Sequence, residues 1–244
     1  MFIGSGTVIN VLTIIGGAGL GVILGVRMPE RMRALITDIL GLITILGGAT
    51  ALAPIVSDRY IQSLPKGWPL LAILASLLIG GVIGSALDLE RRIEASGDYL
   101  RRRFKAEKDG TFVEGFLASS LLFVIGPLAI LGSISDGMGT GTDQLLLKSS
   151  LDFFAAMAFA ASLGWGVAAS AIPVGIYQGL WTLAGFALGS VLSDYQVDAM
   201  TIVGGLMLVS IGLGLLKIKT IAIGNLLPAL AVAPLLVAVL HQFA

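Results

Sequence analysis

Two carboxylates stand inside long apolar runs of the sequence, where an ionisable side chain is expensive to bury. Asp152 lies four residues after Lys148, and Glu114 opens the run that ends before Asp136. A carboxyl group can take up a proton or bind a cation, so both residues are candidates for ion coupling. A structural role is open for each: Asp152 in an i,i+4 ion pair with Lys148, and Glu114 at the positive end of a helix.

Several neutral polar residues in the apolar runs are candidates for binding a solute. Ser119 and Ser120 precede Pro127, which follows a glycine and removes a helix hydrogen bond. Such a break is tolerated in a membrane only where it is buried or lines a cavity. We expect the freed carbonyls and the two hydroxyls to face a polar pocket, with a plain proline kink as the alternative.

The last apolar run contains a similar break. Asn225 lies three residues before Pro228, and Pro234 follows. This pattern predicts a discontinuous helix in which Asn225 and open carbonyls could bind a small ion or polar solute; a plain kink is again the alternative. Gln178, in an earlier run, is a candidate ligand or, like Asn10, an interhelical hydrogen-bonding group.

The composition explains why so few polar residues stand out. The chain has 244 residues, 56% hydrophobic and 12% charged, and its mean hydropathy is +0.97. Soluble domains carry about 25% charged residues. The absence of Cys excludes a disulfide scaffold, and 15 basic residues balanced by 15 acidic ones argue against nucleic-acid binding. We therefore expect an all-α, polytopic membrane protein whose main partner is the lipid bilayer.

The charged residues divide the chain into transmembrane spans of about 20 residues. The uncharged run between Asp152 and Asp194 is too long for one span, so it must turn back near Gly164 and Gly166. This gives eight predicted spans, which are 6–26, 34–56, 68–88, 112–133, 146–165, 172–192, 199–216 and 220–242.

Basic residues predict the orientation. Twelve Lys and Arg fall in the loops on one side of the eight spans and three on the other. The positive-inside rule then places both termini outside. The polar segment 89–110 is predicted to be a cytoplasmic amphipathic helix on the inner leaflet, or simply a solvated connector.

The sequence also indicates an internal repeat. Residues 17–24 and 185–192 both read G-x-x-L-G-x-x-L, and Gly41 and Gly48 have counterparts in Gly205 and Gly212. Within one domain over 1–244, residues 1–88 would form a first repeat, 111–165 two central spans, and 166–244 a second, inverted repeat. Inverted repeats are typical of secondary transporters. Chance matching is the alternative, because Gly and Leu are abundant.

Glycines spaced four apart predict close helix packing. The pairs are Gly17/Gly21, Gly80/Gly84 and Gly185/Gly189. They would pack either within the bundle or between the protomers of a homo-oligomer.

Longer stretches resemble a known family. These are FVEGF at 112–116, SSLLF at 119–123, GPLAILGSISDG at 126–137, KSSLD at 148–152, GIYQG at 175–179 and IGNLLPAL at 223–230. Together they resemble the family of bacterial inner-membrane proteins typified by YdfK and YqgA, whose function is unknown. The resemblance implies a multi-pass protein of the bacterial plasma membrane and no activity.

The residues favour a secondary transporter of a small solute or ion, coupled to H⁺ or Na⁺, that works by alternating access. An oligomeric ion or small-solute channel is the alternative. No phosphate-binding G-x-x-x-x-G-K-[ST] motif occurs. We expect no enzyme activity, no cofactor and no metal site; a regulatory or structural membrane subunit remains open.

Overall fold

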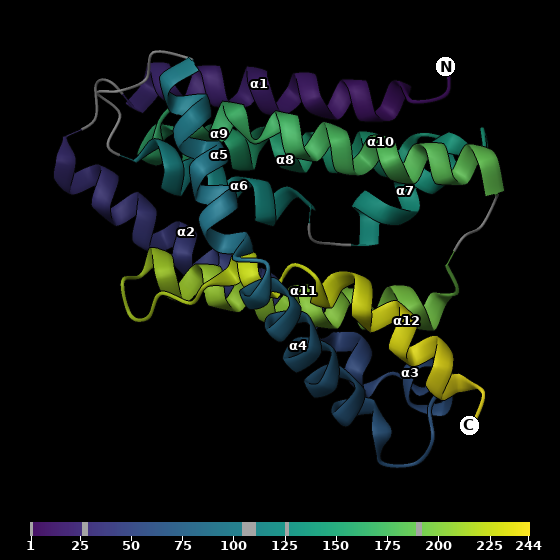
Figure 1. The fold of residues 1–244 in the computed structure, drawn as a ribbon. Helices are drawn as coiled ribbons and strands as arrows, with labels where there is room; N and C mark the ends of the chain where they lie inside the picture. The colour runs from purple at the N-terminus through teal and green to yellow at the C-terminus, as the bar shows by residue number, and fades with distance from the viewer. Residues whose placement is uncertain (1, 26–28, 104–110, 125–126, 189–191) are drawn as a thin grey trace. The chain divides into compact units, whose positions relative to one another are not determined.

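The structure is all-helical. This computed structural model describes residues 2–25, 29–103, 111–124, 127–188 and 192–244. Every regular element in those ranges is a helix, which confirms the predicted all-α class (Figure 1). The elements are α1 Ser5–Gly25, α2 Glu30–Ala51, η1 Ala53–Val56, α3 Asp58–Gln62, α4 Trp68–Ala86, α5 Leu89–Arg103, α6 Phe112–Val124, α7 Pro127–Gly137, α8 Asp143–Leu163, α9 Gly166–Ala169, α10 Ala171–Leu188, α11 Asp194–Leu215, η2 Ile223–Leu226 and α12 Ala229–His241.

Seven helical segments of the described residues are long and apolar enough to cross a membrane, and a bent pair makes up to eight. This agrees with the eight predicted spans. Many large apolar side chains on these helices are exposed, as a lipid-facing surface requires. Among them are Leu12, Ile23, Leu42, Leu46, Leu70, Val82, Leu180 and Leu235.

Two of the predicted spans are interrupted, as their prolines indicated. The fourth consists of α6 and α7, whose axes are bent by 63°; Gly126 lies outside the described residues. The span also continues to Gly137, beyond its predicted end at residue 133. In the eighth span, η2 ends at Leu226 and α12 begins at Ala229, so the break falls at Pro228. Pro234, in contrast, lies inside α12.

Local sequence signals explain several helix ends. The predicted turn after the fifth span falls at Gly164, whose φ of 77° suits glycine. Gly67 has a φ of 87° and precedes α4, which has a proline in its first turn. Before α11, the Ser193 backbone N–H donates to Gln196 Oε1 at 2.8 Å. A side chain in the first turn that accepts from the residue before the helix is typical of helix N-termini.

The chain forms two compact units made of interleaved segments. Unit 1 comprises Met1–Leu40, Glu94–Val124 and Leu128–Val191, and unit 2 comprises Gly41–Ile93, Ile125–Pro127 and Leu192–Ala244. The boundaries fall inside α2 and α5. Helix α5 covers the first part of the predicted linker 89–110, and residues 104–110 lie outside the described part.

In unit 1, glycines bring helix backbones together. Helices α1, α8 and α10 lie side by side (Figure 1). A Cβ at Gly17 or Gly21 of α1 would collide with the carbonyl oxygen of Phe153 or Met157 of α8. Gly185 of α10 meets Ile134 of α7 in the same way. Gly189, its predicted companion, lies outside the described residues. These contacts place α1 and α8 in parallel at very short range.

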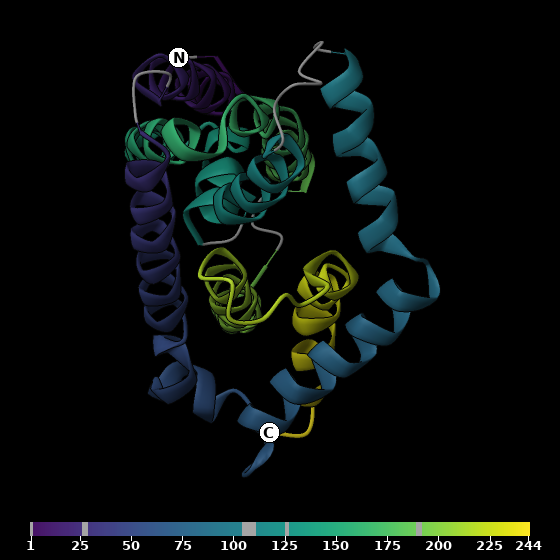
Figure 2. The same ribbon diagram turned by 90° about the vertical axis from the view of Figure 1, so that its left-hand side faces the viewer.

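Unit 2 is packed by the same means around α11, which is buried along most of its length. Gly41 of α2 faces Gly212 of α11, and Gly48 faces Gly205. Gly80 of α4 packs on Ala229, the first residue of α12. Figure 2 shows the two helices side by side. The predicted glycine faces are therefore used within the chain itself.

Candidate functional site

A lysine and an aspartate form an ion pair inside unit 1. Lys148 and Asp152 lie one turn apart on α8, with exposed fractions of 6% and 7%. Lys148 Nζ donates to Asp152 Oδ2. Lys148 Nζ also lies 5.9 Å from the centre of the Phe123 ring of α6, within range of a cation–π interaction. The predicted i,i+4 pair is therefore present, and it is buried.

Two amide side chains extend this pair across three helices. Asn10 of α1 donates from Nδ2 to Asp152 Oδ2 at 3.0 Å and to Gln178 Oε1 of α10 at 3.3 Å. Both amides are fully buried. We call Asn10, Lys148, Asp152 and Gln178 the polar cluster.

The polar cluster leaves two atoms without a partner. Asn10 Oδ1 and Gln178 Nε2 are buried and make no hydrogen bond with the residues that the structure describes. The same holds for Ser119 Oγ and Ser5 Oγ elsewhere in unit 1. An unsatisfied buried polar atom costs about 1–3 kcal/mol. Such atoms mark places where a ligand or a water can bind.

The ionised carboxylate fixes which amide atoms stay open. Asp152 paired with Lys148 only accepts hydrogen bonds, so Asn10 must present its NH₂ group to it. The same NH₂ group reaches Gln178, which must therefore offer its oxygen. The open atoms are then one acceptor on Asn10 and one donor on Gln178.

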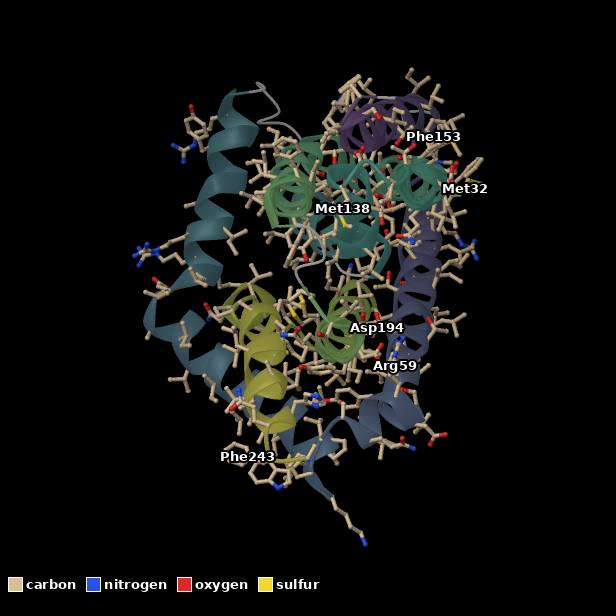
Figure 3. The ribbon with its side chains drawn as sticks, turned by 90° about the vertical axis from the view of Figure 1, so that its right-hand side faces the viewer. Met32, Arg59, Met138, Phe153, Asp194 and Phe243 are labelled. Atoms are coloured by element: carbon tan, nitrogen blue, oxygen red, sulfur yellow. The ribbon has the colours of Figure 1, made fainter. Side chains whose placement is uncertain are left out.

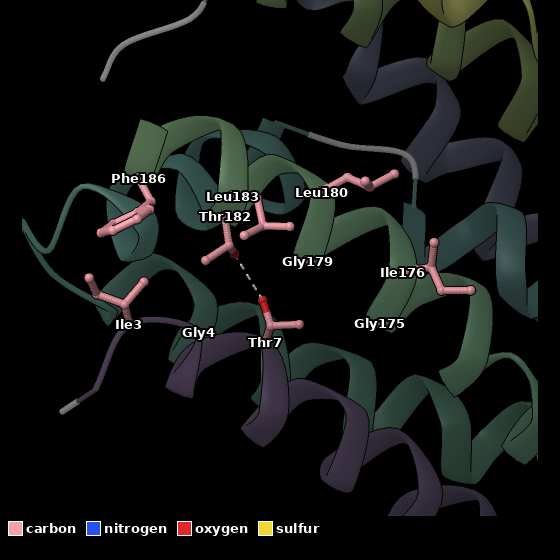
Figure 4. A pocket seen from close by; sticks show the side chains of 10 residues that line it. All are labelled: Ile3, Gly4, Thr7, Gly175, Ile176, Gly179, Leu180, Thr182, Leu183 and Phe186. Carbon is pink, nitrogen blue, oxygen red and sulfur yellow. Dashed lines mark hydrogen bonds between the residues drawn. The ribbon is translucent and has the colours of Figure 1, made fainter. Parts of the chain in front are cut away.

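A groove of about 660 Å³ opens between α1 and α10 beside the polar cluster. Figure 4 shows the Thr7 hydroxyl of α1 pointing toward Thr182 of α10, and their oxygens are 3.3 Å apart. Thr7 lies one turn before Asn10, and the groove also reaches Gly179, next to Gln178. The rest of the wall is largely apolar.

The structure brings together Asp152 and Gln178 among the predicted site residues. Glu114, the third residue of α6, is exposed and lies outside the polar cluster. Ser119 is fully buried, and Ser120 donates to the Phe116 carbonyl of its own helix at 2.5 Å. Pro127 is the first residue of α7. The predicted roles of these residues in binding remain predictions.

Asn225 takes part in a reciprocal contact in unit 2. The Glu90 backbone N–H donates to Asn225 Oδ1 at 2.9 Å, and the Gly224 N–H donates to Glu90 Oε2. The break before α12 is thus held to the start of α5. This contact gives Asn225 a structural function in addition to any role in binding.

The predicted fourth span ends at residue 133, which would leave Asp136 in the loop that follows it. Asp136 lies in α7 and is 2% exposed. Its carboxylate accepts from the backbone N–H groups of Gly4 and Gly6 at 3.2 and 3.1 Å. It thereby satisfies donors at the N-terminus of α1, where a negative charge is favoured. Its spacing from α1, 132 residues, gives no local signal for this contact.

Three charged residues of unit 2 meet near the N-terminus of α11. Arg59 of α3 donates to Asp198 of α11 at 2.8 and 2.6 Å and to Asp194 at 3.3 Å. Figure 3 shows Arg59 and Asp194 near each other. The hydrogen bond to Asp198 raises the pKa of Arg59. In the described part of the chain, no group of three His, Cys, Asp or Glu is placed to hold a metal ion.

Comparisons with known proteins identify the family. A family model described as "Protein of unknown function (DUF554)" matches residues 5–238, and the chain belongs to that family. The uncharacterized membrane protein YdfK of Bacillus subtilis is 30% identical over 98% of this chain and 97% of its own length. The uncharacterized protein YqgA of Escherichia coli is 31% identical over 93% and 94%. No solved structure matches the chain.

Proposed function

We propose that this member of the DUF554 family is a secondary transporter of a small solute or ion, coupled to H⁺ or Na⁺ and working by alternating access. The polar cluster is its coupling site. The family and the helices support a multi-pass membrane protein, and the chemistry of the cluster supports the transport role.

The buried ion pair carries the proposal. Burying two charges is expensive, and replacing such a pair by apolar residues is often neutral or stabilising. Lys148 and Asp152 are therefore poor candidates for a purely structural device. Inside membrane helices, ionisable groups usually mark ion or proton pathways. An aspartate joined to both a lysine and an amide changes its interactions whenever it takes up a proton.

The helix pairs are those an inverted repeat would produce. Gly41 and Gly48 match Gly205 and Gly212 in the sequence, and the observed contacts are Gly41 with Gly212 and Gly48 with Gly205. If each glycine is replaced by its match in the other repeat, the Gly41–Gly212 contact becomes the Gly205–Gly48 contact. A local twofold axis requires contacts to be paired in this way. Helices α2 and α11 are also both 22 residues long. Two related halves would supply the two conformations of alternating access.

Proton coupling can be tested in liposomes of phosphatidylethanolamine and phosphatidylglycerol with a pH-sensitive dye inside. Gradients of sodium chloride, sodium acetate and acetamide are imposed in turn. We expect one of them to drive a saturable proton flux that also shows counterflow. A flux that neither saturates nor shows counterflow would identify a channel instead and overturn the proposal, as would the absence of any flux.

The role of the ion pair is tested by Asp152→Asn, which we expect to abolish the coupled flux. Because this variant leaves Lys148 unpaired, the neutral double variant Lys148→Met/Asp152→Asn serves as a second test. Unchanged proton flux in a folded double variant would remove the pair from the mechanism.

We further propose that the protein lies in the bacterial plasma membrane with both termini outside. The chain has no Cys, so single cysteines report the orientation. Thr140→Cys should react with a membrane-impermeant maleimide in intact spheroplasts, and Arg92→Cys only after permeabilisation. The reverse pattern would contradict this orientation.

A further inference from the structure

We propose that Asn10 and Gln178 form the substrate-binding pair of this transporter, for a small uncharged molecule with a carboxamide or urea edge. The proposal rests on the proposed function and names the substrate class of the same site. It follows from the charge of the polar cluster, from the atoms that are open, and from the position of the pair between the repeats.

The charge of the polar cluster favours an uncharged substrate. Lys148 and Asp152 neutralise each other through a direct ion pair. Asn10 and Gln178 carry no charge. A charged ligand entering this buried site would have to separate the ion pair or remain uncompensated, and an uncompensated buried charge is very costly. An uncharged ligand leaves the pair intact.

The open atoms define the hydrogen bonds that a ligand must supply. Asn10 Oδ1 needs a donor, and Gln178 Nε2 needs an acceptor. They belong to two amides that are hydrogen-bonded to each other. A carboxamide or urea carries an N–H donor and a C=O acceptor side by side, so one such molecule can satisfy both atoms. An alkane or an ether cannot.

The two amides occupy matching positions of the proposed repeats. Asn10 and Gln178 are 168 residues apart, and the same separation relates Gly17 to Gly185 in the G-x-x-L-G-x-x-L motif. Because Asn10 and Gln178 match each other, exchanging the two repeats swaps the two residues and leaves their contact unchanged. In the proposed inverted repeat, the pair would therefore lie on the local twofold axis that relates α1 to α10. Transporter substrates bind where inverted repeats meet.

The groove between α1 and α10 comes within one helical turn of the pair at Thr7 and Thr182 (Figure 4), and the two amides lie buried beyond its lining. Its hydroxyls, on Thr7 and Thr182, lie on the same two helices as Asn10 and Gln178. On the α10 side, Gly175 and Gly179 stand among the bulky side chains of Ile176, Leu180, Leu183 and Phe186. A ligand of a few heavy atoms fits a volume of about 660 Å³ with room to spare, so the amide pair and not the groove would set selectivity.

Uptake of radiolabelled acetamide and urea into the liposomes tests the proposal. We expect saturable uptake above that of protein-free liposomes. N,N-dimethylacetamide, which has no N–H donor, should not compete. Gln178→Met keeps the length of the side chain but removes its hydrogen bonds. It should lower uptake about tenfold, the equivalent of one hydrogen bond.

Thr201→Val is the matched control, because Thr201 is a buried polar residue of unit 2 whose hydroxyl donates to the Val197 carbonyl of its own helix. It should keep wild-type uptake. Uptake no greater than in protein-free liposomes would mean that the open atoms hold a buried water only, and would overturn the proposal. So would equal uptake by wild type and a folded Gln178→Met variant.

The two proposals fail in different ways. Amide uptake that depends on Gln178 but moves no protons would keep the binding pair and contradict the coupling. A proton flux that depends on Asp152 and is driven by sodium chloride or sodium acetate, without amide uptake, would keep the transporter and overturn the substrate class.

Discussion

The two units use the same packing but differ in the polar groups that they leave without a partner. Unit 1 buries an ion pair and two amides among its helices, and all four buried side-chain atoms found without a partner in the described residues belong to it. In unit 2, the buried hydroxyls of Ser76 and Thr201 donate to carbonyls of their own helices, and the hydroxyl of Ser63, which follows α3, donates to the Tyr60 carbonyl. Its buried Asp198 is paired at a helix end.

This difference separates architecture from function. Glycine contacts draw backbones together in both units, at Gly17 on α8 and at Gly48 on α11, so close packing is a property of the whole chain. Unsatisfied polar atoms cost stability and are confined to unit 1 within the described residues. Because this loss of stability occurs in unit 1 and not in unit 2 among the described residues, we infer that function requires the unsatisfied atoms in unit 1.

The largest expected effect comes from breaking the ion pair on one side. Lys148→Met leaves the Asp152 carboxylate buried without its counter-ion, which typically costs about 3–5 kcal/mol. We expect a corresponding loss in the free energy of unfolding, measured by denaturant titration in detergent micelles.

The double variant Lys148→Met/Asp152→Leu is the control. It removes both charges, so its stability should return to the wild-type value or exceed it. If the double variant were as unstable as the single one, the pair would be structural, and the contrast between the units would lose its meaning.

Glycine substitutions should affect both units alike, by about 1–3 kcal/mol through overpacking. Gly17→Leu in unit 1 and Gly48→Leu in unit 2 would each force a side chain against a neighbouring helix backbone. Gly19 and Gly47 have open space at the Cβ position, so Gly19→Leu and Gly47→Leu are matched controls. Equal melting temperatures for Gly48→Leu and Gly47→Leu would show that the α2–α11 contact is not required.

The sequence predicted those features that depend on local pattern. Uncharged runs gave the spans, because about 20 apolar residues cross a bilayer. The prolines at 127 and 228 indicated the breaks, since a proline cannot donate the helix hydrogen bond. The four-residue spacing of Gly17 and Gly21 indicated a packing face, because residues four apart share one side of a helix.

Long-range partners were not predictable in the same way. Asp136 reads as part of a glycine-rich loop, and only the fold shows that it caps α1. Asn10 and Gln178 were recognised as hydrogen-bonding residues, but their partners were not. The two partners of Asn10 are Asp152 and Gln178, which lie 142 and 168 residues away along the chain. Glu114 is exposed near the start of α6, and its proposed role in coupling stays a prediction.

A smaller effect is expected from the cap of α1. Asp136→Ala removes the acceptor for the Gly4 and Gly6 N–H groups, which should cost about 0.5–2 kcal/mol. Asp136→Asn keeps an acceptor oxygen and should lose less. Hydrogen exchange at the first turn of α1 would report the change directly. Faster exchange in Asp136→Ala limited to that turn would assign the effect to the cap.

The smallest effect should come from the ion pair of unit 2. The Arg59 side chain is 57% exposed, so solvent screens its attraction to Asp198. Exposed pairs contribute about 0.2–1 kcal/mol. Asp198→Asn should therefore lower the melting temperature slightly, and 1 M salt should reduce the difference from wild type. A loss as large as that of Lys148→Met would mean that unit 2 also depends on a buried charge. The contrast between the units would then have to be abandoned.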